Sequence, residues 1–181
     1  MKRMFVPKGD YYDILPPRLQ EAQLEVSWAV EPGKETIRGT SAKSAGVRAV
    51  VTAASPQALR EAVECLAYCF HREVECHIQT PYCSCEADDQ HRAYLWTADG
   101  DSAGESLVIG ACCFRLRQWS DAPDGYALQW IWFHPYERRR GHFRKALPYF
   151  TNRFGRIIAE EPYSPAMEAF LKKHRLYPHE Q

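Results

Sequence analysis

The stretch from Tyr126 to Phe150, YALQWIWFHPYERRRGHFRKALPYF, constrains the fold of this chain more than any other part of it. Residues 126–133 predict an interior strand, because apolar side chains fall on both of its faces. Pro135 then ends the strand pairing, three arginines supply positive charge, and Gly141 permits a sharp turn or a close approach to a ligand. Apolar residues recur at helical spacing after the glycine. The pattern predicts a strand, a basic turn and a helix whose first N–H groups bind an anion such as phosphate or pyrophosphate.

Simple alternation along this strand predicts which side chains share a face. One face is expected to carry Tyr126, Leu128, Trp130 and Trp132, and the other Ala127, Gln129, Ile131 and Phe133. Since both sets are largely apolar, we expect both faces to be covered by other parts of the fold.

Length, composition and charge limit the class of protein. At 181 residues and 45% apolar composition, the chain is expected to form one domain with a substantial core. Its 23 Lys and Arg residues balance 23 Asp and Glu residues, which argues against a general nucleic-acid-binding or membrane-surface protein. The sequence has no recognisable signal-peptide core and no run that could span a bilayer, so we expect a cytoplasmic protein without a membrane partner. The cysteines, 7 in number, are expected to be mostly reduced.

The chain is expected to divide into an N-terminal extension, residues 1–45, and a domain formed by residues 46–181. Apolar patterns predict strands at Leu24–Val30, Val47–Ala53, Arg92–Ala98, Ser106–Leu116 and Arg156–Ala159. Helices are expected to begin at Ser55-Pro56 and Ser164-Pro165, where a capping residue precedes proline. The order of these elements is typical of an α/β (α+β) fold in which a strand and a helix precede an antiparallel meander of three strands.

Several possible zinc ligands crowd the segment between the first helix and the meander: His71, Cys76, His77, Cys83, Cys85 and His91. Zinc needs about four such groups in a tetrahedral array, and the spacing lacks the usual pair of cysteines separated by two to four residues. We therefore predict a surface loop with reduced thiols and no metal site. A zinc-stabilised interaction module is the alternative interpretation.

The basic turn, Arg-Arg-Arg-Gly-His-Phe at residues 138–143, resembles the acetyl-CoA signature of the GCN5-related N-acetyltransferase (GNAT) superfamily, Arg/Gln-x-x-Gly-x-Gly/Ala. The C-terminal segment is similar in part to the last helix of that superfamily, with Ser164 in the place of an Asn and Leu171 in that of a Tyr often used as general acid. The resemblance implies a mixed, mainly antiparallel sheet flanked by helices, with a shortened C-terminus. It also implies transfer of an acetyl group from acetyl-CoA to a primary amine by direct attack.

The resemblance assigns roles to particular residues. Backbone N–H groups near Trp132 and Phe133 would polarise the thioester carbonyl of acetyl-CoA. The pyrophosphate would be held by the residues of the turn: Arg138, Arg139, Arg140, Gly141, His142 and Phe143. The candidate catalytic groups are His134, Glu160 and Glu161 as general base, with Tyr163 and Ser164 as proton donors in place of the missing tyrosine.

The acceptor stays open at this point. An amine on a protein or on a small molecule fits the chemistry, and nucleic acid enters only as a carrier of such an amine. Two other functions are compatible with the sequence, each on a degenerate acetyltransferase fold. One is a nucleic-acid-binding protein that uses Arg138–Lys145 to contact phosphates, and the other is the zinc-stabilised interaction module.

Overall fold

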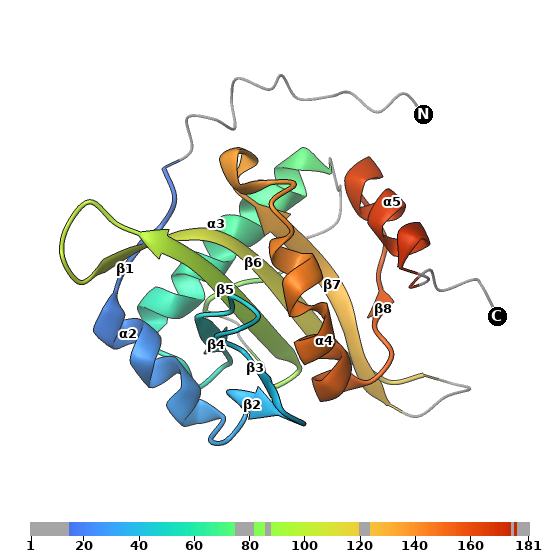
Figure 1. Ribbon diagram of the computed structural model, residues 1–181, viewed down its shortest axis with the longest axis horizontal. Helices are drawn as coiled ribbons and strands as arrows, with labels where there is room; N and C mark the ends of the chain where they lie inside the picture. Colours follow the sequence, from blue (N-terminus) through green and yellow to red (C-terminus); the bar gives the residue numbers. More distant parts are fainter. Residues whose placement is uncertain (1–14, 75–81, 86–87, 120–123, 175, 177–181) are drawn as a thin grey trace.

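A six-stranded sheet forms the centre of the fold (Figure 1). The computed structural model describes residues 15–74, 82–85, 88–119, 124–174 and 176 of the chain. The strands lie in the order β4 (Ala49–Val51), β5 (His91–Asp99), β6 (Glu105–Arg117), β7 (Gly125–Phe133) and β8 (Ile158–Ala159), and β1 (Arg18–Gln20) also pairs with β6. All of these pairs are antiparallel except β7 with β8, which run parallel.

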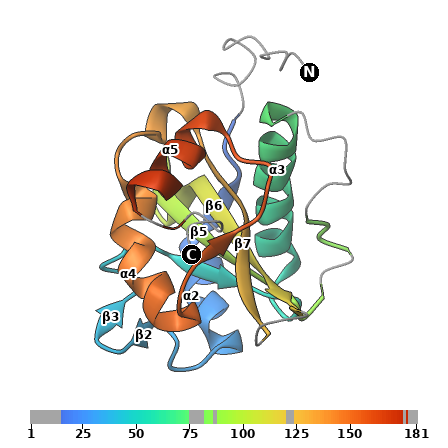
Figure 2. The same cartoon turned by 90° about the vertical axis from the view of Figure 1, so that its right-hand side faces the viewer.

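Helices cover both faces of the sheet (Figure 2). The helix α3 (Gln57–Glu73) packs on one face through an apolar stripe that includes Leu59 and Leu66. The helices α4 (His142–Phe154) and α5 (Pro165–Lys173) lie on the other face. The predicted mixed α/β class, with a mainly antiparallel sheet flanked by helices, is therefore confirmed.

The two predicted helix caps have different outcomes. Ser164 caps α5, because its Oγ accepts the N–H of Met167 at 3.2 Å. The Oγ of Ser55 instead accepts the N–H of Thr52 at 3.0 Å, and α3 begins after Pro56 without a side-chain cap. The cap predicted at Ser55 is wrong because its hydroxyl closes the turn that precedes the helix.

The predicted alternation along β7 is wrong, because a β-bulge interrupts it. Trp130 lies opposite Cys113 and Leu128 lies opposite Phe114, so Gln129 is an extra residue on β7. An extra residue reverses the faces of all side chains that follow it. Leu128 accordingly packs in the core under α4, whereas Trp130 packs in the core under α3.

The strand predicted at Leu24–Val30 is also wrong. These residues belong to the helix α2 (Glu21–Val26) and a 3₁₀ helix, Ser27–Val30. Leu24 and Ser27, at helical spacing, are buried, and Val26 is 48% exposed. The side chains therefore follow a helical period where alternation had suggested a strand. A short hairpin, β2 (Thr36–Ile37) with β3 (Thr40–Ser41), follows.

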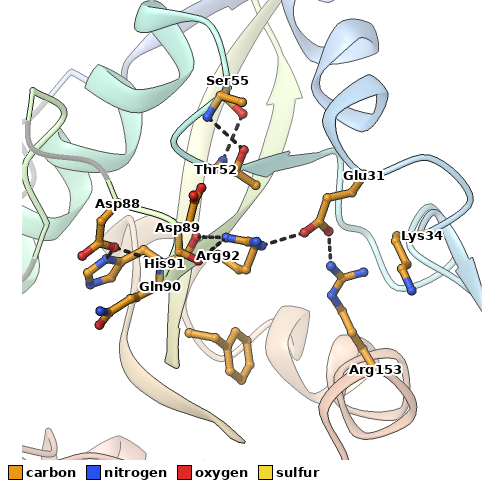
Figure 3. Close-up of polar contacts among 12 residues, drawn as sticks. Glu31, Lys34, Thr52, Ser55, Asp88, Asp89, Gln90, His91, Arg92 and Arg153 are labelled. Carbon is orange, nitrogen blue, oxygen red and sulfur yellow. Dashed lines mark hydrogen bonds and ion pairs between the residues drawn. The ribbon is translucent and has the colours of Figure 1, made fainter. Parts of the chain in front are cut away.

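The segment between residues 15 and 45 is tied to the rest of the fold by a carboxylate that two arginines share. Glu31 lies between Arg92 on β5 and Arg153 on α4 (Figure 3). The Nε of Arg92 is 2.7 Å from Glu31, and the side chains of Glu31 and Arg153 are 12% and 8% exposed. Tyr149 O–H also donates to the carbonyl of Lys34 at 2.6 Å. These contacts fix the N-terminal segment over β5 and α4.

No helix in the described part of the chain combines the length and apolar character needed to cross a membrane.

Candidate functional site

A pocket opens where β7 and β8 part. In the described part of the chain, β8 pairs only with Ala127 and Leu128, and the last bond between the neighbouring segments runs from Glu160 N–H to the Leu128 carbonyl at 2.9 Å. Beyond this point β7 continues to Phe133 while the chain after Glu160 leads into α5. Apolar walls of the pocket come from Phe70, Trp130, Ile131 and Met167, and its polar groups from Gln129, Glu160, Tyr163 and Ser164. The parting exposes an edge of β7 beside these polar groups.

The register of β6 with β7 shows which backbone groups face this edge. His134 N–H donates to the Ile109 carbonyl at 2.9 Å, and the antiparallel register continues through Trp132 and Ala111. Because bonded and non-bonded pairs alternate, the backbone of Trp132 points toward β6, whereas those of Ile131 and Phe133 point away from it. Arg138 Nε already donates to the Phe133 carbonyl at 2.9 Å.

Ile131 is thus the β7 residue whose backbone faces the pocket, and the sequence-based assignment missed it. Of the two residues assigned to the thioester, Phe133 directs its backbone to the open edge and Trp132 does not. The Trp132 indole N–H donates to Glu73 Oε2 at 2.8 Å, on the face that α3 covers. Only knowledge of the bulge at Gln129 could have identified Ile131.

The basic turn has the backbone of an anion-binding loop. Arg139 has a φ of 62° and Gly141 a φ of 78°, and α4 begins immediately afterwards at His142. Left-handed residues in such a turn direct successive N–H groups into one concavity, and the first N–H groups of α4 have no partner within the helix. A β-carbon added to Gly141 would lie 3.5 Å from Arg144 Nη2, so the Arg144 guanidinium lies over this glycine. Arg144 was not among the predicted site residues.

Carboxylates engage several of the predicted phosphate contacts. Arg138 pairs with Glu73, while Arg140 and His142 lie 3.2 Å and 3.0 Å from Glu137. These acidic partners reduce the net positive charge that a nucleic-acid phosphate would meet. Arg139 and Arg144 are also exposed, and Arg144 lies over the glycine.

Phe143, which stands where the signature has a small residue, faces the core. Its side chain is 7% exposed and contacts the rings of Phe150 and Phe170, with centroid distances of 5.9 Å and 5.4 Å. Leu171, in the place of the usual tyrosine, is also fully buried. The larger side chain of Phe143 therefore fills the interior and leaves the outer surface of the turn uncovered.

The candidate catalytic residues fall into two groups. Glu160, Tyr163 and Ser164 line the pocket, and neither His134 nor Glu161 appears among the described residues that line it. His134 is 8% exposed at the end of β7, where its ring stacks on Tyr136 with centroids 5.4 Å apart. Glu161 is exposed to solvent. The structure therefore brings three of the five predicted groups together.

The pocket residues already have partners that restrict what they can do. Both oxygens of Glu160 accept hydrogen bonds of 2.7 Å, from Arg117 and from Arg115. The Tyr163 hydroxyl donates to the Ala159 carbonyl at 2.8 Å. Gln129 Oε1 is buried without a hydrogen-bond partner in the described part of the chain. Its amide is therefore an available acceptor beside the bulge.

Among the described residues, no group of three or more His, Cys, Asp or Glu side chains is placed to hold a metal ion. Cys76 and His77, two of the possible zinc ligands, lie outside the described residues. His91 is engaged with Asp88, its Nδ1 lying 2.6 Å from the carboxylate (Figure 3). A scan against models of protein families finds no match, and no curated protein is significantly similar in sequence.

Proposed function

We propose that the chain is an N-acetyltransferase of the GNAT type, which binds acetyl-CoA between β7 and β8 and transfers the acetyl group to a primary amine. The observation that carries the proposal is the alignment of the parted strands with the start of α4. The open edge of β7 begins at the pocket and ends, after Phe133, at the left-handed turn that leads into the helix. A long ligand with an anionic group at one end and a reactive group at the other fits this arrangement.

The backbone of β7 supports binding of the pantetheine arm. An extended chain with amide groups can add to an exposed strand edge as a further strand would. Ile131 presents its N–H and carbonyl to that edge, and the pocket walls on either side of it are apolar. The pantetheine arm would therefore lie along β7, in the position that β8 would occupy if it continued beyond Ala159.

The turn supports binding of the pyrophosphate. Backbone N–H groups near Gly141 and at the first turn of α4 would donate to its oxygens, and Arg139 and Arg144 would supply charge. Arg138 would act through its contacts with Glu73 and the Phe133 carbonyl, which hold the turn against β7.

The pocket end supports the chemistry of acyl transfer. A neutral amine attacks the thioester carbonyl, the oxyanion of the tetrahedral intermediate is stabilised by a backbone N–H, and the CoA thiolate leaves with a proton. The hydroxyls of Tyr163 and Ser164 are the candidate donors of that proton. Gln129 Oε1 would accept an N–H of the amine and orient it. Glu160, with both oxygens bonded to arginines, would fix the wall of the pocket, and His134 remains a candidate base.

The test is binding of acetyl-CoA by calorimetry to the parent chain and to Gly141→Asp. We expect the parent to bind and the variant to lose at least tenfold in affinity, because a carboxylate would occupy the anion site. Gly155→Asp is the matched control, since Gly155 has a φ of 77° at the other end of the same helix. Equal binding by the parent and Gly141→Asp would remove the proposed pyrophosphate site, and absence of binding to the parent would remove the function.

A further inference from the structure

Two cysteine thiols meet beside α3, apart from the site between β7 and β8. The sulfur atoms of Cys83 and Cys85 are 2.8 Å apart. Cys85 is exposed to solvent and Cys83 is partly exposed. Both sulfurs are therefore within reach of a small molecule.

The sulfur separation discriminates between the two reactions that a pair of cysteines commonly supports. Sulfurs joined in a disulfide lie about 2.05 Å apart. Two thiolates bound to one tetrahedral zinc ion lie about 3.8 Å apart, given zinc–sulfur bonds of about 2.3 Å. The observed 2.8 Å is closer to the first value than to the second. A sulfur–sulfur bond consequently needs a smaller movement of the side chains than a shared zinc ion does.

The residue between the two cysteines is held on α3 through its hydroxyl and its carbonyl. Ser84 Oγ donates to Glu64 Oε2 at 2.6 Å, and the Ser84 carbonyl accepts a hydrogen bond from Arg60 Nη1. Tyr82, on the other side of Cys83, is 5% exposed and belongs to the core under α3. Because folding already fixes this backbone, part of the entropy cost of bringing the two sulfurs together has been met before any reaction.

We propose that Cys83 and Cys85 form a redox-active dithiol that is oxidised by low-molecular-weight disulfides such as glutathione disulfide. This assignment does not depend on the acyl-CoA proposal. The Cys85 thiolate attacks one sulfur of glutathione disulfide, whose S–S bond breaks and releases one glutathione thiolate. The Cys83 thiolate then attacks the Cys85 sulfur, forms the internal disulfide and releases the second glutathione. The protons of the two cysteines pass to the two glutathione thiolates, so no other oxidant is needed.

Cys65 offers an internal comparison, because it is exposed but the helix holds its neighbouring cysteine at a spacing too wide for a disulfide. Its neighbour Cys69 lies four residues further along α3. Residues at that spacing have β-carbons about 5–6 Å apart, whereas a disulfide needs about 3.8 Å. Cys65 should therefore stop at a mixed disulfide with glutathione.

The experiment equilibrates the reduced full chain with glutathione buffers of increasing oxidised fraction, quenches the thiols and maps the products by peptide mass spectrometry. We expect one peptide that contains Cys83 and Cys85 to lose two hydrogens. The variants Cys83→Ser and Cys85→Ser should each accumulate a glutathione adduct on the remaining cysteine. A parallel Cys65→Ser chain should form the Cys83–Cys85 disulfide as readily as the parent.

Three results would overturn the proposal: the two thiols stay reduced while Cys65 reacts, the parent accumulates a stable adduct at Cys85, or either cysteine pairs with a different one. Stoichiometric zinc that is released when Cys83 and Cys85 are alkylated would overturn it as well.

The role of the docked backbone is tested by Glu64→Ala, which removes the acceptor of the Ser84 hydroxyl. We expect the equilibrium constant for ring closure to fall about tenfold. Glu61→Ala on the same helix is the control, and equal effects of both changes would contradict the role of docking.

Discussion

Arg138, at the start of the basic turn, forms a two-point ion pair with Glu73 at the end of α3. Arg138 Nη1 lies 2.8 Å from Glu73 Oε1, and Nη2 lies 2.5 Å from Oε2. The same carboxylate accepts the Trp132 indole N–H, and Arg138 Nε donates to the Phe133 carbonyl. One guanidinium therefore joins α3, the end of β7 and the turn. The planar fork of arginine is required for this set of contacts.

Arg138→Lys should weaken acetyl-CoA binding about tenfold, because lysine keeps the charge but cannot make the forked contacts. The loss in the free energy of unfolding should be small, about 1 kcal/mol, since both side chains of the pair are about one-third exposed. Calorimetry and thermal unfolding measure the two effects. Arg139→Lys is the control, because this exposed arginine should lose little affinity and no stability on the change. If the Arg138→Lys chain bound acetyl-CoA as tightly as the parent, the contacts of Arg138 with Glu73 and the Phe133 carbonyl would have no part in the site.

Glu31→Gln should destabilise the fold strongly. The change leaves Arg92 and Arg153 without their shared carboxylate, and removal of one partner from a buried ion pair costs about 3–5 kcal/mol. Chemical denaturation gives the free energy of unfolding. Glu168→Gln is the matched control, because its pair with Lys172 is exposed on α5 and should contribute less than about 1 kcal/mol. Equal effects of the two changes would mean that Glu31 does not hold the N-terminal segment in place.

Strong local patterns made several elements predictable. The strands β5, β6 and β7 and the helices α4 and α5 were all expected within a few residues, because apolar periodicity and the Ser164 cap act locally. The left-handed Gly141 was also predictable, since the basic run and helical stripe around it call for a turn.

Features that depend on distant residues were not predictable. The bulge at Gln129 is defined only by how β7 pairs with β6, so alternation put Trp130 on the wrong face. The pairing of Arg138 with Glu73 joins residues 65 apart in sequence. The strand prediction at Leu24–Val30 was wrong for a related reason. A short apolar alternation is compatible with a strand or a helix, and only burial against the rest of the fold selects between them.

Gly110→Ala should destabilise the end of β7. A β-carbon at this position would lie 2.1 Å from a ring carbon of Phe133, so Gly110 makes room for that ring. Overpacking of this kind costs about 1–3 kcal/mol. Thermal unfolding should show the loss, and the double variant Gly110→Ala with Phe133→Leu should recover part of it, because the smaller side chain releases the contact. Additive losses in the double variant would show that the two residues do not compete for the same space.

Cys65 should be the most readily alkylated cysteine of α3 near neutral pH. A hydrogen bond from the Cys69 thiol lowers the pKa of Cys65 to about 7, whereas that bond and burial raise the pKa of Cys69. Because only the thiolate reacts, the rate at Cys65 should rise with pH through a midpoint near 7 and level off only above it. Iodoacetamide labelling followed by peptide mapping, repeated across pH, measures this profile.

The matched variant for this prediction is Cys69→Ala, which removes the donor. It should move the midpoint of the Cys65 profile toward the ordinary thiol value of about 8.5. The rate at pH 7 should fall about threefold, because less of Cys65 is then thiolate, although each thiolate is a stronger nucleophile. Cys112 and Cys113 should stay unlabelled at the same pH, because burial raises the pKa of both thiols. A Cys65 profile whose midpoint is unchanged by Cys69→Ala would show that the neighbouring thiol does not activate it.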